Sequence, residues 1–144
     1  MRADFGRVLV DVDSIEKAAS WAIWGKIWHE FDGQQFPAWG WNDMVVPYLT
    51  ALAQGVRDAS DGRRAQVMFF DGPFWIRIQG VANALELEPG GGGSDVPSCV
   101  TDRVSLSSAV LDAGRLVVEA CECKGWGEDD DVRRLRSALQ LLSL

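Results

Sequence analysis

The stretch Phe36–Asp43, with the sequence Phe-Pro-Ala-Trp-Gly-Trp-Asn-Asp, constrains the fold of this chain more than any other segment. Pro37 and Gly40 favour a sharp change of direction, because proline fixes φ and glycine adopts conformations that other residues avoid. A tryptophan-rich segment, residues 19–31, precedes the stretch, and an apolar helical pattern follows it over about 43–57. We therefore expect a structural corner between a strand and a helix.

The two tryptophans and the Asn-Asp pair of this corner have separate expected roles. Trp39 or Trp41 is expected to fill the core, and Asn42 or Asp43 to cap the helix with a side-chain oxygen. Pro47 implies that the helix begins late or bends there, because proline lacks the N–H that a helix interior needs. The inward face of the helix is expected to consist of Val45, Leu49, Leu52, Ala53 and Val56.

The segments before the corner read as strands. Residues 5–12 alternate around three valines and predict a strand with one wet face, followed at 14–17 by a turn or a helical piece. Residues 19–31 fit helical spacing as well as alternation, and we favour a strand because Trp and Ile suit strands and Gly25 weakens a helix. On that strand one face carries Trp24, Lys26, Trp28 and Glu30, and the other carries Trp21, Ile23, Ile27 and Phe31.

The segments after the helix predict a hairpin and then two more helices. Residues 64–70 and 74–79 flank the tight turn Asp71-Gly72-Pro73, a strand is expected at 85–88, and the glycines at 90–93 predict a flexible loop. Apolar stripes predict helices from about 105 to the Gly125-Trp126-Gly127 stop and over 129–142. The fold class is therefore α+β: an antiparallel sheet of about 4–6 strands packed on one side by about three helices, in a single domain over 1–144.

The charge of the chain narrows the class of partner. The formal net charge is −7 over 144 residues, with seven Lys/Arg against ten Asp/Glu in residues 1–72 and seven against eleven in 73–144. Nucleic-acid binding is not expected, because it requires clustered basic residues. A membrane partner is not expected either, because no apolar run approaches the roughly 20 residues that a membrane-spanning helix needs. The charge suits a basic protein partner, and it would equally serve solubility alone.

The cysteines and the lone histidine predict no metal, cofactor or catalytic site. Three cysteines without a signal-peptide pattern indicate free thiols and a cytoplasmic location. Cys121 and Cys123 would point about 200° apart on a helix, which excludes a shared zinc ion there. No nucleophile motif surrounds any serine, so no catalytic partner is predicted for His29. His29 is expected to be a surface or half-buried side chain. Asp43 and Asp71 could form an acid–base pair, but aspartates in turns more often bond to the local backbone.

The candidate binding residues are Trp24, Trp28, Glu30, Trp75 and Asp71, because the chain has seven tryptophans and exposed aromatics are typical of binding surfaces. Whether this tryptophan-rich face is exposed or is covered by a loop or a second copy stays open. The residues expected to build turns or caps are Pro37, Gly40, Trp41, Asn42, Asp43, Gly72 and Pro73.

Several segments resemble a family of small, acidic, uncharacterised bacterial proteins: residues 24–31 with the following Asp32-Gly33, the corner, the Phe69-Phe70-Asp71-Gly72-Pro73-Phe74 hairpin and the Gly125-Trp126 pair. Met44, where that family prefers Phe, and Pro47 depart from its pattern. Such proteins are similar to the immunity proteins of bacterial toxin systems, which bind and neutralise a cognate toxin. The resemblance implies a non-enzymatic, toxin-binding domain with an acidic, aromatic-rich surface, and it brings no catalytic residues.

Two other functions remain open from the sequence. One is a small-ligand-binding or enzymatic domain with a pocket lined by Trp24, Trp28, Trp75 and Asp71, in which a carboxylate has a raised pKa. The other is a homodimer that buries the tryptophan-rich face.

Overall fold

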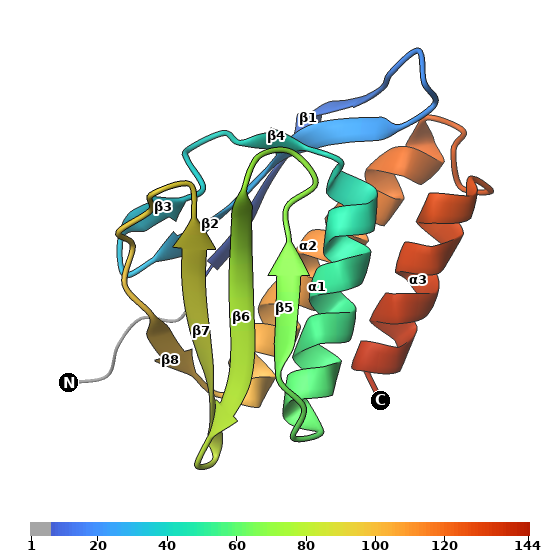
Figure 1. Ribbon diagram of the computed structural model, residues 1–144. Helices are drawn as coiled ribbons and strands as arrows, with labels where there is room; N and C mark the ends of the chain where they lie inside the picture. The colour runs from blue at the N-terminus through green and yellow to red at the C-terminus, as the bar shows by residue number, and fades with distance from the viewer. Residues whose placement is uncertain (1–6) are drawn as a thin grey trace.

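The computed structural model describes residues 7–144, which form eight strands and three helices (Figure 1). The strands are β1 (Arg7–Lys17), β2 (Ile23–Phe31), β3 (Gln34–Phe36), β4 (Asn42–Asp43), β5 (Ala65–Met68), β6 (Phe74–Val81), β7 (Ala84–Gly91) and β8 (Cys99–Thr101). The helices are α1 (Val45–Ser60), α2 (Arg103–Cys123) and α3 (Asp130–Leu142).

The strands form two antiparallel sheets of four strands each, which confirms the α+β class. In the first sheet β2 is central, with β1 along one edge and both β3 and β4 along the other. The second sheet has the order β5-β6-β7-β8. The single sheet expected from the sequence is thus divided in two, because the chain turns at the 37–41 segment and α1 intervenes before β5.

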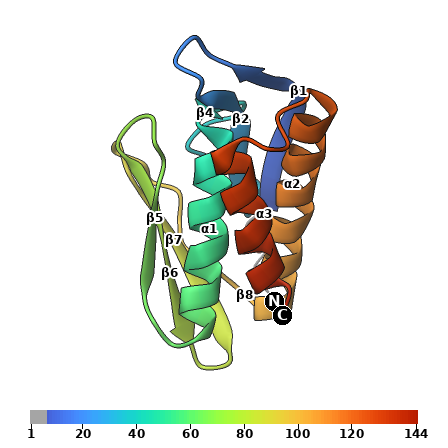
Figure 2. The same cartoon turned by 90° about the vertical axis from the view of Figure 1, so that its right-hand side faces the viewer.

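The helices lie on the inner sides of the two sheets. Helix α1 contacts β2 of the first sheet and β5 and β6 of the second, α2 packs on β1, and α3 packs on α1 and α2 (Figure 2). Alternation explains how the sheets meet this layer, since successive strand residues point to opposite faces. On β2 the side chains of Ile23, Ile27, His29 and Phe31 are buried, with Gly25 between them, as the alternating pattern predicts for this parity.

Helix α1 begins without the side-chain cap expected of it. Its N-cap residue is Met44, no side chain bonds to the first turn, and Asn42 is exposed in β4. Pro47 lies in the first turn, where its missing N–H breaks no helical bond. The other helices do have caps: Asp102 accepts from the N–H of Ser105, and Asp129 accepts from the N–H of Asp131. Gly125 follows α2 with φ of +82°, as the glycine stop predicts.

Three expectations about the strands need correction. Residues 14–17 belong to β1, whose pairing with β2 shifts register between Asp11 and Glu16, and they are neither a separate turn nor a helical piece. Trp21 lies in the β1–β2 turn with φ of +72° and not on the strand. Gly90 and Gly91 pair with Trp75 and Phe74 as the end of β7, so only the last two glycines of the run lie in a loop. Residues 5 and 6 of the first predicted strand lie outside the described residues.

Gly91 and Gly93 allow a matched test of how tightly β6 and β7 approach. Both have positive φ (+89° and +72°), but a Cβ at Gly91 would lie 1.8 Å from the carbonyl oxygen of Pro73, whereas nothing lies within 4 Å at Gly93. We expect Gly93→Ala to cost about 1 kcal/mol through its backbone conformation alone. Gly91→Ala should cost about 2 kcal/mol more, because the backbone must move. Urea unfolding of both variants measures the difference. Equal losses of stability would mean that the backbone near Pro73 moves away from the new Cβ without a further loss of stability.

Candidate functional site

One buried carboxylate joins the corner at 36–43 to the β5–β6 turn. The Asp43 side chain is fully buried and accepts four hydrogen bonds. Two come from its own segment, from Trp41 Nε1 (3.0 Å) and the N–H of Met44 (2.7 Å). The other two come from the backbone N–H groups of Phe70 (3.1 Å) and Asp71 (3.2 Å). We call Asp43 with these four donors the Asp43 clamp.

Aromatic packing reinforces the Asp43 clamp. The ring of Trp41 meets Phe74 edge-on at 5.2 Å between centroids, and Phe74 in turn meets Phe36 at 5.7 Å. Gly72 has φ of +81°, and a Cβ there would lie 3.2 Å from the ring of Trp41. Only glycine therefore satisfies both the backbone and the space at this point. The two turns form one rigid unit although they lie about 30 residues apart in sequence.

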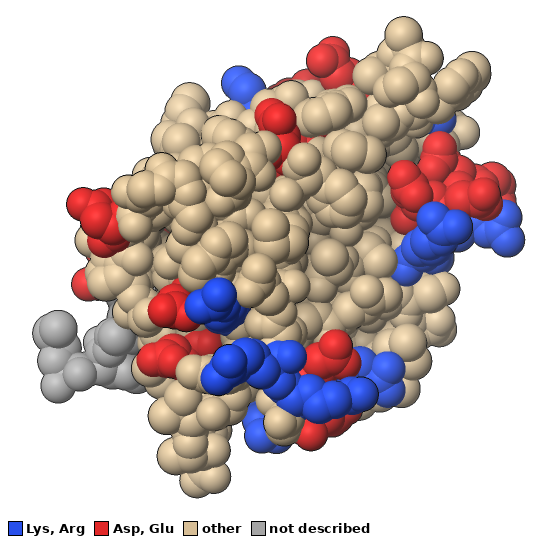
Figure 3. All heavy atoms as spheres, viewed as in Figure 1, with Lys and Arg blue, Asp and Glu red and all other residues tan. Residues whose placement is uncertain are grey.

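The two joined turns and the adjoining end of β5 present large apolar side chains to solvent. Trp39 is 73% exposed, Phe70 is 53% exposed and Met68 is 46% exposed. We call these three residues the aromatic face. In Figure 3 the upper part of the surface, over these turns and the ends of β5, β6 and β7, carries few charged side chains. The charged groups drawn in this view gather lower on the strands and beside α3.

The outward face of the first sheet supports the aromatic face from below. Trp28 is nearly buried because Trp39 lies against it, with 5.6 Å between ring centroids. Its Nε1 donates to Gln35 Oε1 (2.7 Å), and Gln35 Nε2 donates to Glu30 Oε2 (2.8 Å). The bond from Gln35, ahead of the bond and charge of Arg7, lowers the pKa of Glu30. Trp28 and Glu30 therefore hold Trp39 in place through packing and a polar chain.

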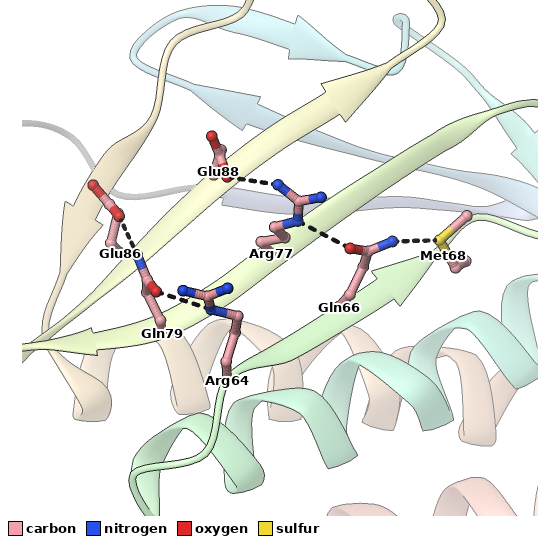
Figure 4. Close-up of polar contacts among 7 residues, drawn as sticks. All are labelled: Arg64, Gln66, Met68, Arg77, Gln79, Glu86 and Glu88. Carbon is pink, nitrogen blue, oxygen red and sulfur yellow. Dashed lines mark hydrogen bonds and ion pairs between the residues drawn. The ribbon is translucent and has the colours of Figure 1, made fainter.

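The outward face of the second sheet is a layer of paired polar side chains. Arg77 lies over the ring of Trp75, 4.2 Å from its centroid, and contacts Gln66 and Glu88. Trp75 lies flat over Gly90, where a Cβ would come within 2.2 Å of the ring. Figure 4 shows both rows of this layer: one runs from Glu88 through Arg77 and Gln66 to Met68, and the other runs from Arg64 through Gln79 to Glu86. The carboxylates here are engaged with neighbours in the same sheet.

The five residues predicted to bind are thus divided between two surfaces. Trp28 and Glu30 lie directly beneath Trp39, Trp24 lies further along the same face of β2, and Trp75 belongs to the polar layer. Asp71 is exposed in the turn held by the Asp43 clamp. The sequence interpretation missed Trp39 as a surface residue, and it missed Met68 and Phe70 altogether. Met68 and Phe70 are two residues apart in the 64–70 segment, and this alternation was the sequence signal that both side chains point to the same face.

His29 lies in the core and not at the surface or half-buried position expected for it. It is 1% exposed, and its Nε2 shares a 2.7 Å hydrogen bond with the hydroxyl of Tyr48. Burial lowers the pKa of His29 to about 3, and burial together with the charge of Asp43 raises the pKa of Tyr48. The buried ring of His29 is therefore neutral at pH 7. The arrangement is a packed aromatic and polar core.

Cys99 and Cys121 are buried, and burial raises the pKa of the Cys121 thiol to about 11. Within residues 7–144 no group of three or more His, Cys, Asp or Glu side chains is placed to hold a metal ion. Open grooves of about 650 and 520 Å³ lie between the helices, and neither is lined by a tryptophan or by Asp71. Neither groove is the tryptophan-lined pocket considered from the sequence.

No protein-family model, curated protein or solved structure matches this chain. In the part of the chain that the structure describes, no helix combines the length and the apolar character needed to cross a bilayer. The functional argument is therefore made from the geometry of the aromatic face and the Asp43 clamp.

Proposed function

We propose that this chain is a non-enzymatic protein-binding domain of the immunity type, which neutralises a cognate toxin domain by covering part of its surface. The observation that carries the proposal is the aromatic face: Trp39, Met68 and Phe70 are exposed on or beside two turns that the Asp43 clamp fixes together. Large apolar side chains on a rigid support are typical of binding hot spots, because little conformational entropy is lost when a partner covers them.

The charge of the chain supports a basic partner. A net charge of −7 attracts a basic domain at long range and raises the association rate, while the large side chains at the proposed contact are apolar. This division of roles is common at interfaces, where the core is apolar and the rim is charged. The association rate should therefore fall as salt is added, while the dissociation rate changes little.

If a toxin domain is encoded beside this gene, replacing Trp39 or Phe70 with alanine should weaken binding to it. We expect each change to lower the affinity at least about tenfold, mainly through faster dissociation, because the apolar contact is lost. Surface plasmon resonance at low salt measures both rates. Trp21→Ala is the matched control, since Trp21 is 76% exposed in the distant β1–β2 turn.

Three outcomes would contradict the proposal. The neighbouring gene product could fail to bind at low salt, which would remove the partner. The Trp21 variant could lose as much affinity as the Trp39 variant, which would move the contact away from the aromatic face. Finally, the wild-type domain could bind the toxin domain and leave its activity intact, which would exclude neutralisation by occlusion.

A further inference from the structure

Strand β1 leaves one of its edges without a partner strand. It pairs with β2 through Arg7↔Glu30, Val8↔His29, Leu9↔Trp28, Val10↔Ile27 and Asp11↔Lys26, and within residues 7–144 no strand pairs with its other edge. In Figure 2 β1 is seen between α3 and α2, and it packs against α2. The regular part of this edge strand, residues 7–11, is a template for a further strand, since its outward N–H and C=O groups have no ladder partner among the described residues.

The direction of the free hydrogen-bonding groups on β1 can be fixed from β2. The N–H of Ile27 donates to the carbonyl of Trp41 at 2.8 Å, on the side of β2 away from β1. In an antiparallel pair, opposed residues point their backbone groups either both toward each other or both away. Val10, opposite Ile27, therefore directs its N–H and C=O to the free edge, and so does Val8 two residues earlier.

Residues 7–11 are complementary to a second copy of the same segment that runs antiparallel to the first. Read from residue 7, Arg-Val-Leu-Val-Asp places a positive charge at one end, a negative charge at the other and three apolar residues between them. An antiparallel copy centred on Leu9 opposes Arg7 to Asp11, Val8 to Val10 and Leu9 to Leu9. The valines are then the hydrogen-bonded pairs, in agreement with the direction of their free groups. The opposite charges face each other at both ends.

The surface beside β1 is also suited to being covered. A groove of about 460 Å³ runs between β1 and α2, and Val8, Val10, Ala109 and Leu116 are among its lining residues. Leu116 and Val104, also at the groove, are exposed large apolar side chains. The inward valines of an added strand would extend this apolar lining. An isologous contact of this kind has two-fold symmetry, as most homodimers do.

We propose that β1 is a homodimerisation strand, which pairs antiparallel with β1 of a second copy about a two-fold axis at Leu9 and joins the two first sheets into one. This surface differs from the aromatic face and from the tryptophan-burying dimer considered from the sequence. Its paired residues, 7–11, do not include Trp39, Met68 or Phe70. Its success or failure is therefore independent of toxin binding.

Disulfide trapping of the full chain tests both the dimer and its register. Leu9 would oppose its own copy as a non-hydrogen-bonded pair, with Cα atoms about 4.5 Å apart, which suits a disulfide. In a Cys123→Ser background, which removes the exposed native thiol, Leu9→Cys should give a cross-linked dimer under mild oxidation. Asp11→Cys should give none, because Asp11 opposes Arg7. A parallel pairing would cross-link both variants and would overturn the proposed geometry.

Sedimentation of the uncross-linked protein provides the second measurement. The mass should rise with concentration toward twice the 15.8 kDa of the chain. Leu9→Lys, which places two like charges on the axis, should raise the dimer dissociation constant at least about tenfold. Asp13→Lys, on the same strand but outside the paired segment, should leave it within about twofold. A strict monomer at high concentration, or an equal effect of both lysines, would overturn the proposal.

Discussion

Asp43→Ala should lower the free energy of unfolding by about 3–5 kcal/mol, because it removes the acceptor that four donors share. The carboxylate bonds to Trp41 Nε1 and to the N–H groups of Met44, Phe70 and Asp71. A hydrogen bond to a charged group contributes roughly 1.5–3 kcal/mol, and a buried donor left unpaired costs about 1–3 kcal/mol. Some of these donors will reach water after the change, which keeps the loss below the full sum.

Urea unfolding checks this value against two companions. Asn42→Ala, next in sequence but exposed in β4, should change stability by less than about 0.5 kcal/mol. Asp43→Asn keeps one acceptor oxygen and turns the other into a donor, so its loss should be intermediate. A loss below about 1 kcal/mol for Asp43→Ala would mean that Asp43 does not hold the two turns together, and the rigid support proposed for the aromatic face would fail with it.

The hydrophobic pattern predicted the strands and helices that are long enough to show a period. The alternation along β2 correctly separated Trp24, Lys26, Trp28 and Glu30 from Ile23, Ile27 and Phe31. The same alternation indicates that His29 is buried, because His29 is on the same face as Ile27 and Phe31. The expectation of a surface or half-buried histidine gave more weight to residue type than to position. Strands β3, β4 and β8 have only two or three residues each, too few to show a period.

The candidate site was harder to predict because its decisive contacts are long-range. A carboxylate just before a helix is normally a cap, and Asp43 has that position in sequence. Its partners Phe70 and Asp71 lie 27 and 28 residues further on, and nothing in the local pattern connects them. In the same way Trp28 is nearly buried because Trp39 lies against it. The exposed tryptophan of this pair is therefore Trp39 in the turn, and Trp28 on the strand packs beneath it.

The buried histidine should make stability depend on pH between about 6.5 and 3. Burial lowers the pKa of His29 to about 3 in the folded protein, whereas an unfolded chain titrates near 6.5. Between these values the unfolded state binds a proton that the folded state does not, so acid favours unfolding. The stabilisation is complete above about pH 6.5 and is lost as the pH falls, at about 1.4 kcal/mol per pH unit. From pH 7 to pH 5 His29 alone should therefore cost about 2 kcal/mol.

Comparison with His29→Phe isolates this contribution. Phenylalanine has a similar shape for the ring contacts with Phe31, Tyr48 and Phe69 but binds no proton. The variant loses the hydrogen bond to Tyr48 at every pH, so its absolute stability should be lower, while its stability should fall about 2 kcal/mol less than that of the wild type from pH 7 to pH 5. Urea unfolding at intervals of half a pH unit gives both curves. Parallel curves would show that His29 gains its proton in the folded state, which requires a core open enough to solvate the charge.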